Sequence, residues 1–465
     1  RPVGPKTGCR LADSLRPAVM TRRLLAIGLL ASLTLPAVTS RIYASDEVEY
    51  FAFLRSVCFD RDLSFENEYQ HFADAGAGGS GFRETFLGER FTRAGRRLNF
   101  ATVGPALLWA PFYGVGHIAA GIHGDPQDGY SQPYITAVAI GSAVYAWLAI
   151  LLAASIAKRW FGAGLAAALA VLAGTPLLFY LYVAPLFSHA CATFAVTLCL
   201  WTWLRVRERW SLTGVVCLGL TAGLMATMRD QAGLFALGPA LDFGRWALTR
   251  HDWRRTMGLI VAGTAATAIA YTPQLLASRA VNGYFGPHES IGNKMSWSSP
   301  HALGVLVDME YGWLWWTPLA LIALAGLIAL AMGRIRIKVE DGRWLAICMV
   351  VVAAVQIYIN GAVESWTVAG SFGQRRFVEL TPLLVVGLAA LASSSRRRLV
   401  WGLAAVCIWW NLGLLLQFGT HRMDRQRLTL GHNASQTFIE LPLEAPSLAW
   451  RYLTNRASFY RQPRQ

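Results

Sequence analysis

The sequence predicts an all-α fold, a polytopic bundle of about eleven membrane-spanning helices. Hydrophobic residues make up 54% of the 465-residue chain and charged residues only 15%, against about 25% in soluble proteins. The apolar residues are concentrated in runs of roughly 17–25 residues, the length that a helix needs to cross a hydrocarbon core about 30 Å thick. These runs must be helical because lipid offers the backbone no hydrogen-bond partners.

The expected spans have boundaries that are defined only to within a few residues. They cover 24–42, 132–156, 162–182, 186–206, 212–228, 231–248, 256–278, 313–333, 344–362, 377–394 and 399–418. The first run ends in PAVTS and also resembles a signal peptide, but the polytopic chain beyond it favours an uncleaved helix. The bundle then occupies 24–418, between an amino-terminal tail at 1–23 and a carboxyl-terminal tail at 419–465.

Short basic clusters alternate with the spans and orient the bundle, because cytoplasmic loops carry an excess of Lys and Arg. The clusters fall at 22–23, 158–159, 205–209, 250–255, 334–338 and 396–398. They predict a cytoplasmic amino terminus, with 43–130, 279–312, 363–376 and the carboxyl-terminal tail outside. The Ala- and Arg-rich composition suits a bacterium, so the expected location is a bacterial inner membrane. The net charge of +15 is gathered at helix ends and not on one continuous basic face, which excludes nucleic-acid binding.

The first outer loop, 43–130, contains a second apolar stretch at 101–122. Counting this stretch as a span would break the alternation of charge. We therefore expect one or two interfacial helices that lie on the outer leaflet. Pro105 and Pro111 favour a broken helix.

The same loop begins with SDEVEY, directly after the first span. If Ser45 caps a helix, then Asp46, Glu49 and Tyr50 share one face of it. A carboxylate there would meet the head group of a lipid-linked substrate at the membrane surface. The alternative is that these acids only stabilise the positive end of the helix dipole.

Two arginines, Arg375 and Arg376, lie on the outer side, where basic pairs are unusual. A guanidinium pair suits a phosphate or pyrophosphate through bidentate bonds, and lipid head groups are the alternative partner. Arg229 and Asp230 separate two apolar runs, either as a mutually paired turn or as part of a substrate path. His189 and Trp366 occupy outer helix ends, where they either pack or bind substrate.

Four further residues of the first loop could bind a divalent cation, a candidate cofactor, although their spacing matches no complete calcium-loop motif. They are Asp60, Asp62, Glu66 and His71. A solvated acidic loop is the alternative. The seven cysteines show neither zinc-ligand spacing nor a disulfide framework.

Several stretches together resemble the GT-C superfamily of membrane glycosyltransferases, in particular a bacterial branch of multi-pass proteins. They are SDEVEYFAFLRSVCFDRDLSFENEY, VGPALLWAPFYGVGH, PLFSHA, MRDQAGLFAL, TPQLLASRAVNGYFGP, HALGVLVDMEYGWLWWTPLAL and GSFGQRRFVELTPLL. Each is weakly specific alone, but their order and placement agree with the family.

The resemblance implies a catalytic carboxylate just after the first span, which Asp46 matches best, with Glu47 adjacent. It implies that Arg375, Arg376 and Arg229 hold the phosphate of a polyprenyl-phosphate-linked sugar. The expected activity is inverting transfer of that sugar to a glycan, lipid or protein acceptor on the extracytoplasmic face. The alternatives are a flippase or transporter of lipid-linked saccharides, an outer-face polysaccharide polymerase or ligase with a pyrophosphate-linked donor, and a non-catalytic scaffold.

Overall fold

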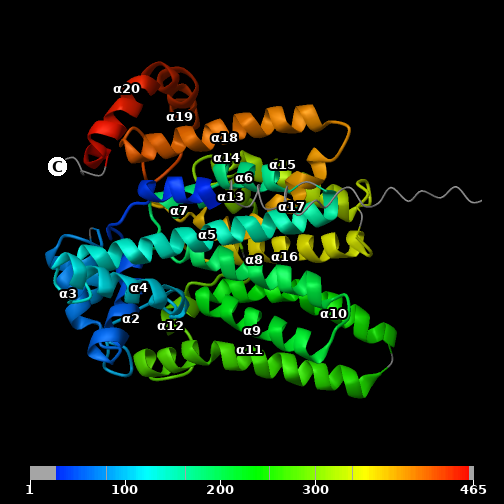
Figure 1. Cartoon of the computed structure of the whole chain (residues 1–465), viewed down its shortest axis with the longest axis horizontal. Coiled ribbons are helices and arrows are strands. Elements are labelled where there is room, and N and C mark those ends of the chain that lie inside the picture. Colours follow the sequence, from blue (N-terminus) through cyan, green and yellow to red (C-terminus); the bar gives the residue numbers. More distant parts are fainter. Residues whose placement is uncertain are drawn as a thin grey trace, which may run out of the picture.

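The computed structural model describes residues 28–459 apart from 80, 163, 251, 299 and 338, and within these ranges the chain is helical with no strand. The main helices lie side by side along the longest axis (Figure 1). Their bounds are α2 (Ser45–Arg55), α3 (Glu66–Asp74), α4 (Gly104–His123), α5 (Gln132–Phe161), α6 (Leu165–Ala173), α7 (Leu177–Tyr182), α8 (His189–Val206), α9 (Leu212–Met228), α10 (Leu237–Arg250), α11 (Trp253–Asn282), α12 (Glu289–Asn293), α13 (Ala302–Val307), α14 (Trp313–Trp316), α15 (Pro318–Ala331), α16 (Gly342–Ala362), α17 (Thr381–Ala392), α18 (Arg397–Gly419), α19 (Leu430–Ser435) and α20 (Leu441–Thr454).

Short 3-10 and π-helical segments, labelled η, join or extend these helices. They are η1 (Leu35–Ala37), η2 (Ser56–Asp60), η3 (Arg83–Leu87), η4 (Asp230–Ala236), η5 (Arg375–Leu380), η6 (Gln436–Glu440) and η7 (Arg456–Phe459). The first predicted span, 24–42, begins outside the described residues, and the predicted tail at 1–23 lies entirely outside them. Its described part is helical from residue 28 and ends with η1, five residues earlier than expected.

Four helices are long and apolar enough to cross a membrane: α5, α11, α16 and α18. The chain is therefore a membrane protein, whereas the count of about eleven spans stays a prediction. Several predicted spans are divided into two shorter helices. Proline marks the start of the second helix: Pro176 precedes α7, Pro318 is the first residue of α15 and Pro382 is the second residue of α17. Its ring fixes a helical φ and its missing N–H costs nothing at a helix start.

The divided spans are broken toward one end of the bundle. Trp313 at the start of α14 stacks on Phe377 of η5 with ring centroids 4.3 Å apart. Irregular backbone at membrane depth is tolerated where protein surrounds it. The breaks therefore collect polar backbone and side chains at a single end of the bundle.

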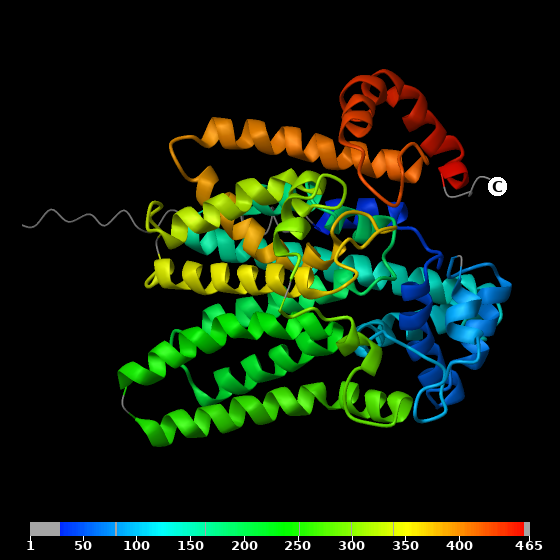
Figure 2. The ribbon, with the colours of Figure 1, turned by 180° about the vertical axis from the view of Figure 1, so that it is seen from behind.

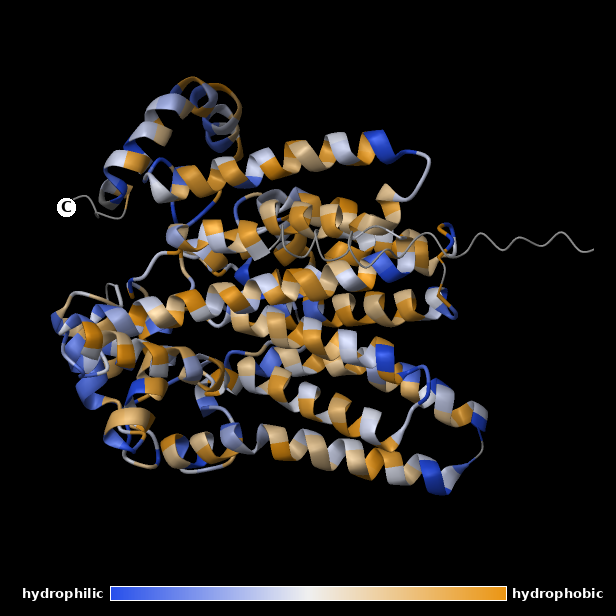
Figure 3. Ribbon diagram, in the orientation of Figure 1, coloured by the Kyte–Doolittle hydropathy of each residue, from blue (hydrophilic) through white to orange (hydrophobic). Residues whose placement is uncertain are grey.

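The first outer loop and the carboxyl-terminal helices α19 and α20 lie at that same end in both views (Figures 1 and 2). Hydrophilic residues mark the opposite helix ends (Figure 3), where the loops at 158–159, 205–209, 334–337 and 396–398 turn. The basic clusters thus lie together at one end of the bundle, as their alternation with the spans predicted.

The apolar stretch at 101–122 forms one continuous helix, α4, and the expectation of a broken helix is wrong. Pro105 lies in its first turn, where proline is tolerated, and Pro111 is accommodated inside it. Trp109 donates to Ser142 at 2.8 Å and His117 bonds Tyr134 at 2.6 Å, so α4 runs antiparallel to the first half of α5.

Glycines let two pairs of helices approach closely. A Cβ on Gly387 of α17 would overlap the carbonyl oxygen of Ala323 on α15, and one on Gly326 would overlap the carbonyl oxygen of Gly387. On α9, Gly219 and Gly223 face α11 in the same way. Such small-residue contacts are typical of helix packing in membranes, where close van der Waals contact replaces the hydrophobic effect.

Candidate active site

Helix α2 begins one residue earlier than expected, because Ala44 and not Ser45 is its N-cap. The carboxylate of Glu47 accepts the backbone N–H groups of Tyr43 at 3.0 Å and Ala44 at 3.1 Å. Glu47 therefore caps its own helix, and burial raises its pKa to about 8. The structure does not bring Glu47 to the predicted arginines.

Asp46, one residue earlier, points to a different side of α2 and forms an ion pair with Arg375 at 2.8 Å. The Asp46 side chain is 36% exposed and the Arg375 side chain 24% exposed. The guanidinium of Arg375 also lies over the ring of Phe187, 5.3 Å from its centroid. Two predicted site residues from distant parts of the chain thus meet directly, and both are accessible to a ligand.

Glu49 and Tyr50 occupy the next turn of α2. Burial raises the pKa of Tyr50 to about 12, an effect that the nearby Arg229 and the Ser188 hydroxyl oppose. Glu49 accepts the N–H of Phe100 at 2.6 Å, and burial followed by the charge of Asp46 raises its pKa to about 8. Tyr50 therefore belongs to the neighbourhood of Asp46 and Arg229, while Glu49 anchors the segment before α4.

Arg229 ends α9 with an extended backbone (φ −162°). Its guanidinium lies 2.7 Å from His189 Nδ1 and 3.4 Å from Glu379 Oε1. The same Nδ1 lies 3.1 Å from Glu379 Oε1, so it faces both a guanidinium that donates and a carboxylate that accepts. Arg229 is thus held between α8 and η5, and the predicted pairing with Asp230 is not formed, since Asp230 faces the Tyr271 hydroxyl at 3.5 Å.

Arg376 donates to the carbonyl and hydroxyl oxygens of Ser365 at 3.0 and 2.9 Å. Burial, with added repulsion from Arg375 and Arg229, lowers its pKa to about 9, so it stays protonated at neutral pH. The three predicted arginines consequently lie close enough to influence one another. We call Asp46, Arg229, Arg375, Arg376, His189 and Glu379 the arginine cluster.

Glu379 is the member that the sequence analysis missed. It follows Arg375 and Arg376 on the same short helix, in the segment QRRFVEL, and is 1% exposed. An ionisable residue at the start of an apolar run was the available signal, because such residues are costly in a membrane. Trp366, in contrast, packs against His301 and Tyr311. Among the described residues, its ring contacts do not include the three arginines.

The acidic residues of the first loop are engaged in the loop itself. Asp60 pairs with Arg55, Glu66 pairs with Arg97, and Asp62 accepts from Ser56 at 2.9 Å. The ring of His71 stacks on Tyr130 at 3.9 Å. Within the described ranges, no group of three or more His, Cys, Asp or Glu side chains is arranged to hold a metal ion.

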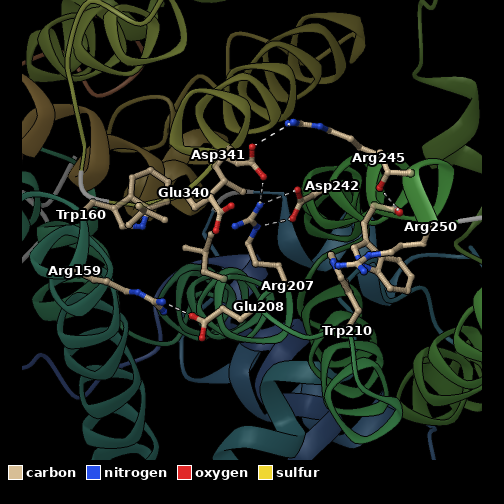
Figure 4. Close-up of a pocket in the computed structure, with 15 residues that line it drawn as sticks. Arg159, Trp160, Arg207, Glu208, Trp210, Asp242, Arg245, Arg250, Glu340 and Asp341 are labelled. Carbon is tan, nitrogen blue, oxygen red and sulfur yellow. Dashed lines mark hydrogen bonds and ion pairs between the residues drawn. The ribbon is translucent and has the colours of Figure 1, made fainter.

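A cavity of about 520 Å³ opens at the other end of the bundle (Figure 4). Its charged side chains are largely paired among themselves: Arg207 bonds Asp242 at 2.8 Å, and Arg245 bonds Asp341 at 3.2 Å. Asp242 also accepts from the indoles of Trp203 and Trp344. No member of the arginine cluster lines this cavity, which joins α5, α8, α10 and α16 near the basic loops.

No family model matches the chain, and no curated protein matches it by sequence. Among solved structures, ArnT from Cupriavidus metallidurans bound to undecaprenyl phosphate is similar, with a TM-score of 0.52 and 15% identity over 94% of this chain and 73% of that one. The archaeal oligosaccharyltransferase AglB from Archaeoglobus fulgidus, in complex with an inhibitory peptide and a dolichol-phosphate, gives a TM-score of 0.50 at 12% identity. That likeness covers 96% of this chain, which spans only 57% of AglB.

The bundle of this membrane protein thus has the fold of ArnT and AglB. Both similar structures are GT-C superfamily membrane enzymes. The chain therefore has the GT-C fold, as the sequence resemblance predicted.

Proposed function

We propose that this protein is a GT-C-type glycosyltransferase that moves a sugar from a polyprenyl-phosphate carrier to an acceptor hydroxyl at the extracytoplasmic face of the membrane. The observation that carries the proposal is the Asp46–Arg375 ion pair, which sets a carboxylate beside three guanidiniums. The undecaprenyl phosphate and dolichol-phosphate of the two similar structures support a carrier of this kind.

In the transfer, Asp46 takes the proton of the acceptor hydroxyl as that oxygen attacks the anomeric carbon. The bond from this carbon to the phosphate oxygen breaks, and its electron pair stays on the phosphate. The products are a glycoside with an inverted anomeric centre, a polyprenyl phosphate with one more negative charge, and a protonated Asp46 that returns its proton to water. A positioned base contributes about 10²–10⁴-fold to such a rate.

The cations stabilise the charge that develops on the leaving phosphate, which preorganised guanidiniums do without reorganisation at the moment of reaction. Arg375 has a second effect because it is also the partner of Asp46. A bound phosphate competes for Arg375 and leaves the Asp46 carboxylate free to face the acceptor hydroxyl. Donor binding thus prepares Asp46 for the acceptor.

The location of the arginine cluster supports the outer face. Helix α2, which carries Asp46, lies at the end of the bundle opposite to the basic loops (Figures 1 and 3), and basic loops favour the cytoplasm. A flippase would instead require charged groups along a path through the bilayer, whereas the candidate site residues gather at one end. A divalent cation stays a candidate cofactor, and the acceptor is a glycan, lipid or protein.

The test is transfer by the purified protein in nanodiscs, supplied with a panel of radiolabelled sugars on polyprenyl phosphate. We expect sugar release by the wild type, and release about 10²–10⁴-fold slower by Asp46→Asn. Asp74→Asn is the matched control, because Asp74 pairs with Arg83 in the same loop. Undiminished release by Asp46→Asn removes Asp46 from the base role, and movement of intact carriers across the bilayer without release supports the flippase.

A further inference from the structure

Glu379 introduces a buried negative charge into a site whose proposed task is to attract phosphate. Its Oε1 faces Arg229 and His189, while Oε2 is buried without a hydrogen-bond partner among the described residues. A carboxylate in this position costs desolvation free energy. A neutral side chain could also orient Arg229, so this role alone does not explain why the residue at position 379 is charged.

The charge of the arginine cluster can be counted from the contacts. Arg229, Arg375 and Arg376 carry three positive charges against two negative charges on Asp46 and Glu379, and His189 is neutral because burial and the adjacent Arg229 guanidinium disfavour a second cation there. Glu49, beside Asp46, is mostly protonated at neutral pH, since its pKa is about 8. The six residues of the arginine cluster therefore carry one net positive charge, and Asp230 is not counted because its carboxylate faces Tyr271.

That single charge matches a sugar joined to its carrier through one phosphate, which is a diester with one negative charge. During transfer the phosphate becomes a monoester with up to two negative charges, while Asp46 takes up a proton. The total charge in the site is then unchanged from substrates to products. A pyrophosphate-linked donor carries one negative charge more and leaves the site with an uncompensated charge, which is costly away from water.

We propose that Glu379 is a specificity-determining residue that sets the charge of the arginine cluster for a carrier with one phosphate and against a carrier with pyrophosphate. This inference rests on the proposed function, because it concerns the donor of the same site. Glu379 acts through Arg229, so the proposal requires no contact between Glu379 and the donor. The inference also opposes the polymerase or ligase alternative, whose donor is pyrophosphate-linked.

The experiment compares two lipids that differ by one phosphate, undecaprenyl phosphate and undecaprenyl pyrophosphate, in equilibrium binding to the full chain in nanodiscs. We expect the wild type to prefer the monophosphate. Glu379→Gln removes one negative charge at nearly constant shape and should shift the affinity ratio about tenfold toward the pyrophosphate. Arg229→Gln removes one positive charge and should shift it the other way, which keeps the test decisive if the first variant is unstable.

Two variants act as controls. Glu379→Asp keeps the charge and should keep the wild-type ratio. Glu68→Gln alters another buried, ion-paired glutamate, whose partner Arg55 lies 3.1 Å away in the first loop, and should also leave the ratio unchanged. An unchanged ratio in Glu379→Gln, or an equal shift in Glu68→Gln, overturns the inference while sugar transfer from the monophosphate carrier still supports the proposed function. A wild type that binds neither lipid overturns both.

Discussion

Asp46 on α2 and Arg375 on η5 are joined at 2.8 Å, although the first begins the outer loop and the second precedes α17. The pair predicts opposite effects of two substitutions on donor binding. Asp46→Asn should bind undecaprenyl phosphate at least as tightly as the wild type, because Arg375 loses its competing anion. Arg375→Gln should weaken binding about tenfold or more, as expected for loss of a charge-assisted bond of about 1.5–3 kcal/mol.

Calorimetry or lipid competition on both variants measures this difference, and the double variant measures the coupling between the two residues. Equal weakening by both substitutions would mean that Asp46 itself holds the donor or the fold. In that case the donor phosphate does not free Asp46 from Arg375, and Asp46 does not act as the base.

How much of this site the sequence could predict depends on the kind of interaction. Asp46, Arg229 and Arg375 could be named because charged residues beside apolar runs are conspicuous. Their meeting in space could not be derived from local periodicity, since it depends on how α2, α9 and η5 pack. The family resemblance supplied that expectation.

Local patterns also failed where a tertiary contact or a backbone detail decided the outcome. The start of α2 was expected at a Ser45 cap, but the Glu47 side chain provides the capping oxygen from within the helix. Hydropathy predicted one continuous helix for each divided span. Pro176, Pro318 and Pro382 were the available signals of the breaks, because proline is favoured at the start of a helix. The bounds 212–228 were correct because α9 has no such interruption.

Glu47 predicts a pH dependence of stability. Its carboxyl has a pKa of about 8 in the folded chain, against 4.5 as the ordinary value. Below about pH 4.5 both folded and unfolded chains hold the proton, so there is no difference. Between the two values only the folded chain keeps the proton, so the free energy of unfolding falls as pH rises, by up to about 5 kcal/mol in total.

Glu47→Gln keeps a side-chain oxygen that can accept the backbone N–H groups of Tyr43 and Ala44, but it removes the titratable carboxyl group. Its thermal unfolding midpoint should fall less than that of the wild type between pH 5 and pH 8. Glu89→Gln, at an exposed position of the same loop, should follow the wild type. Parallel pH profiles for wild type and Glu47→Gln would contradict the prediction.

Gly387 predicts a packing defect that reaches the candidate site. A methyl group there would overlap the carbonyl oxygen of Ala323, so α15 and α17 must separate. Overpacking of this kind costs about 1–3 kcal/mol. Since α17 continues directly from η5, which carries Arg375, we expect Gly387→Ala to lower both the unfolding temperature and donor affinity.

Gly402→Ala on α18 is the matched control, because a Cβ there meets nothing within 4 Å. Thermal unfolding in detergent and binding of undecaprenyl phosphate are measured for both variants. A normal unfolding temperature for Gly387→Ala would show that the two helices tolerate separation.

Cys58 offers a test of the proposed orientation, which determines on which side of the membrane the sugar is transferred. It is exposed in the first loop, whereas Cys191, Cys199, Cys348 and Cys407 are buried. In a variant that keeps only Cys58, a membrane-impermeant maleimide should label intact spheroplasts, because the loop 43–130 is predicted to lie outside.

The companion variant carries Arg254→Cys as its single cysteine, at an exposed position in a predicted cytoplasmic loop. It should be labelled only after the membrane is opened. Because Asp46 and Cys58 lie on the same loop, labelling of Cys58 from outside also locates the Asp46–Arg375 pair at the outer face. The reverse labelling pattern would place the arginine cluster in the cytoplasm, where soluble nucleotide-linked sugars are available, and would remove the reason for a lipid-linked donor.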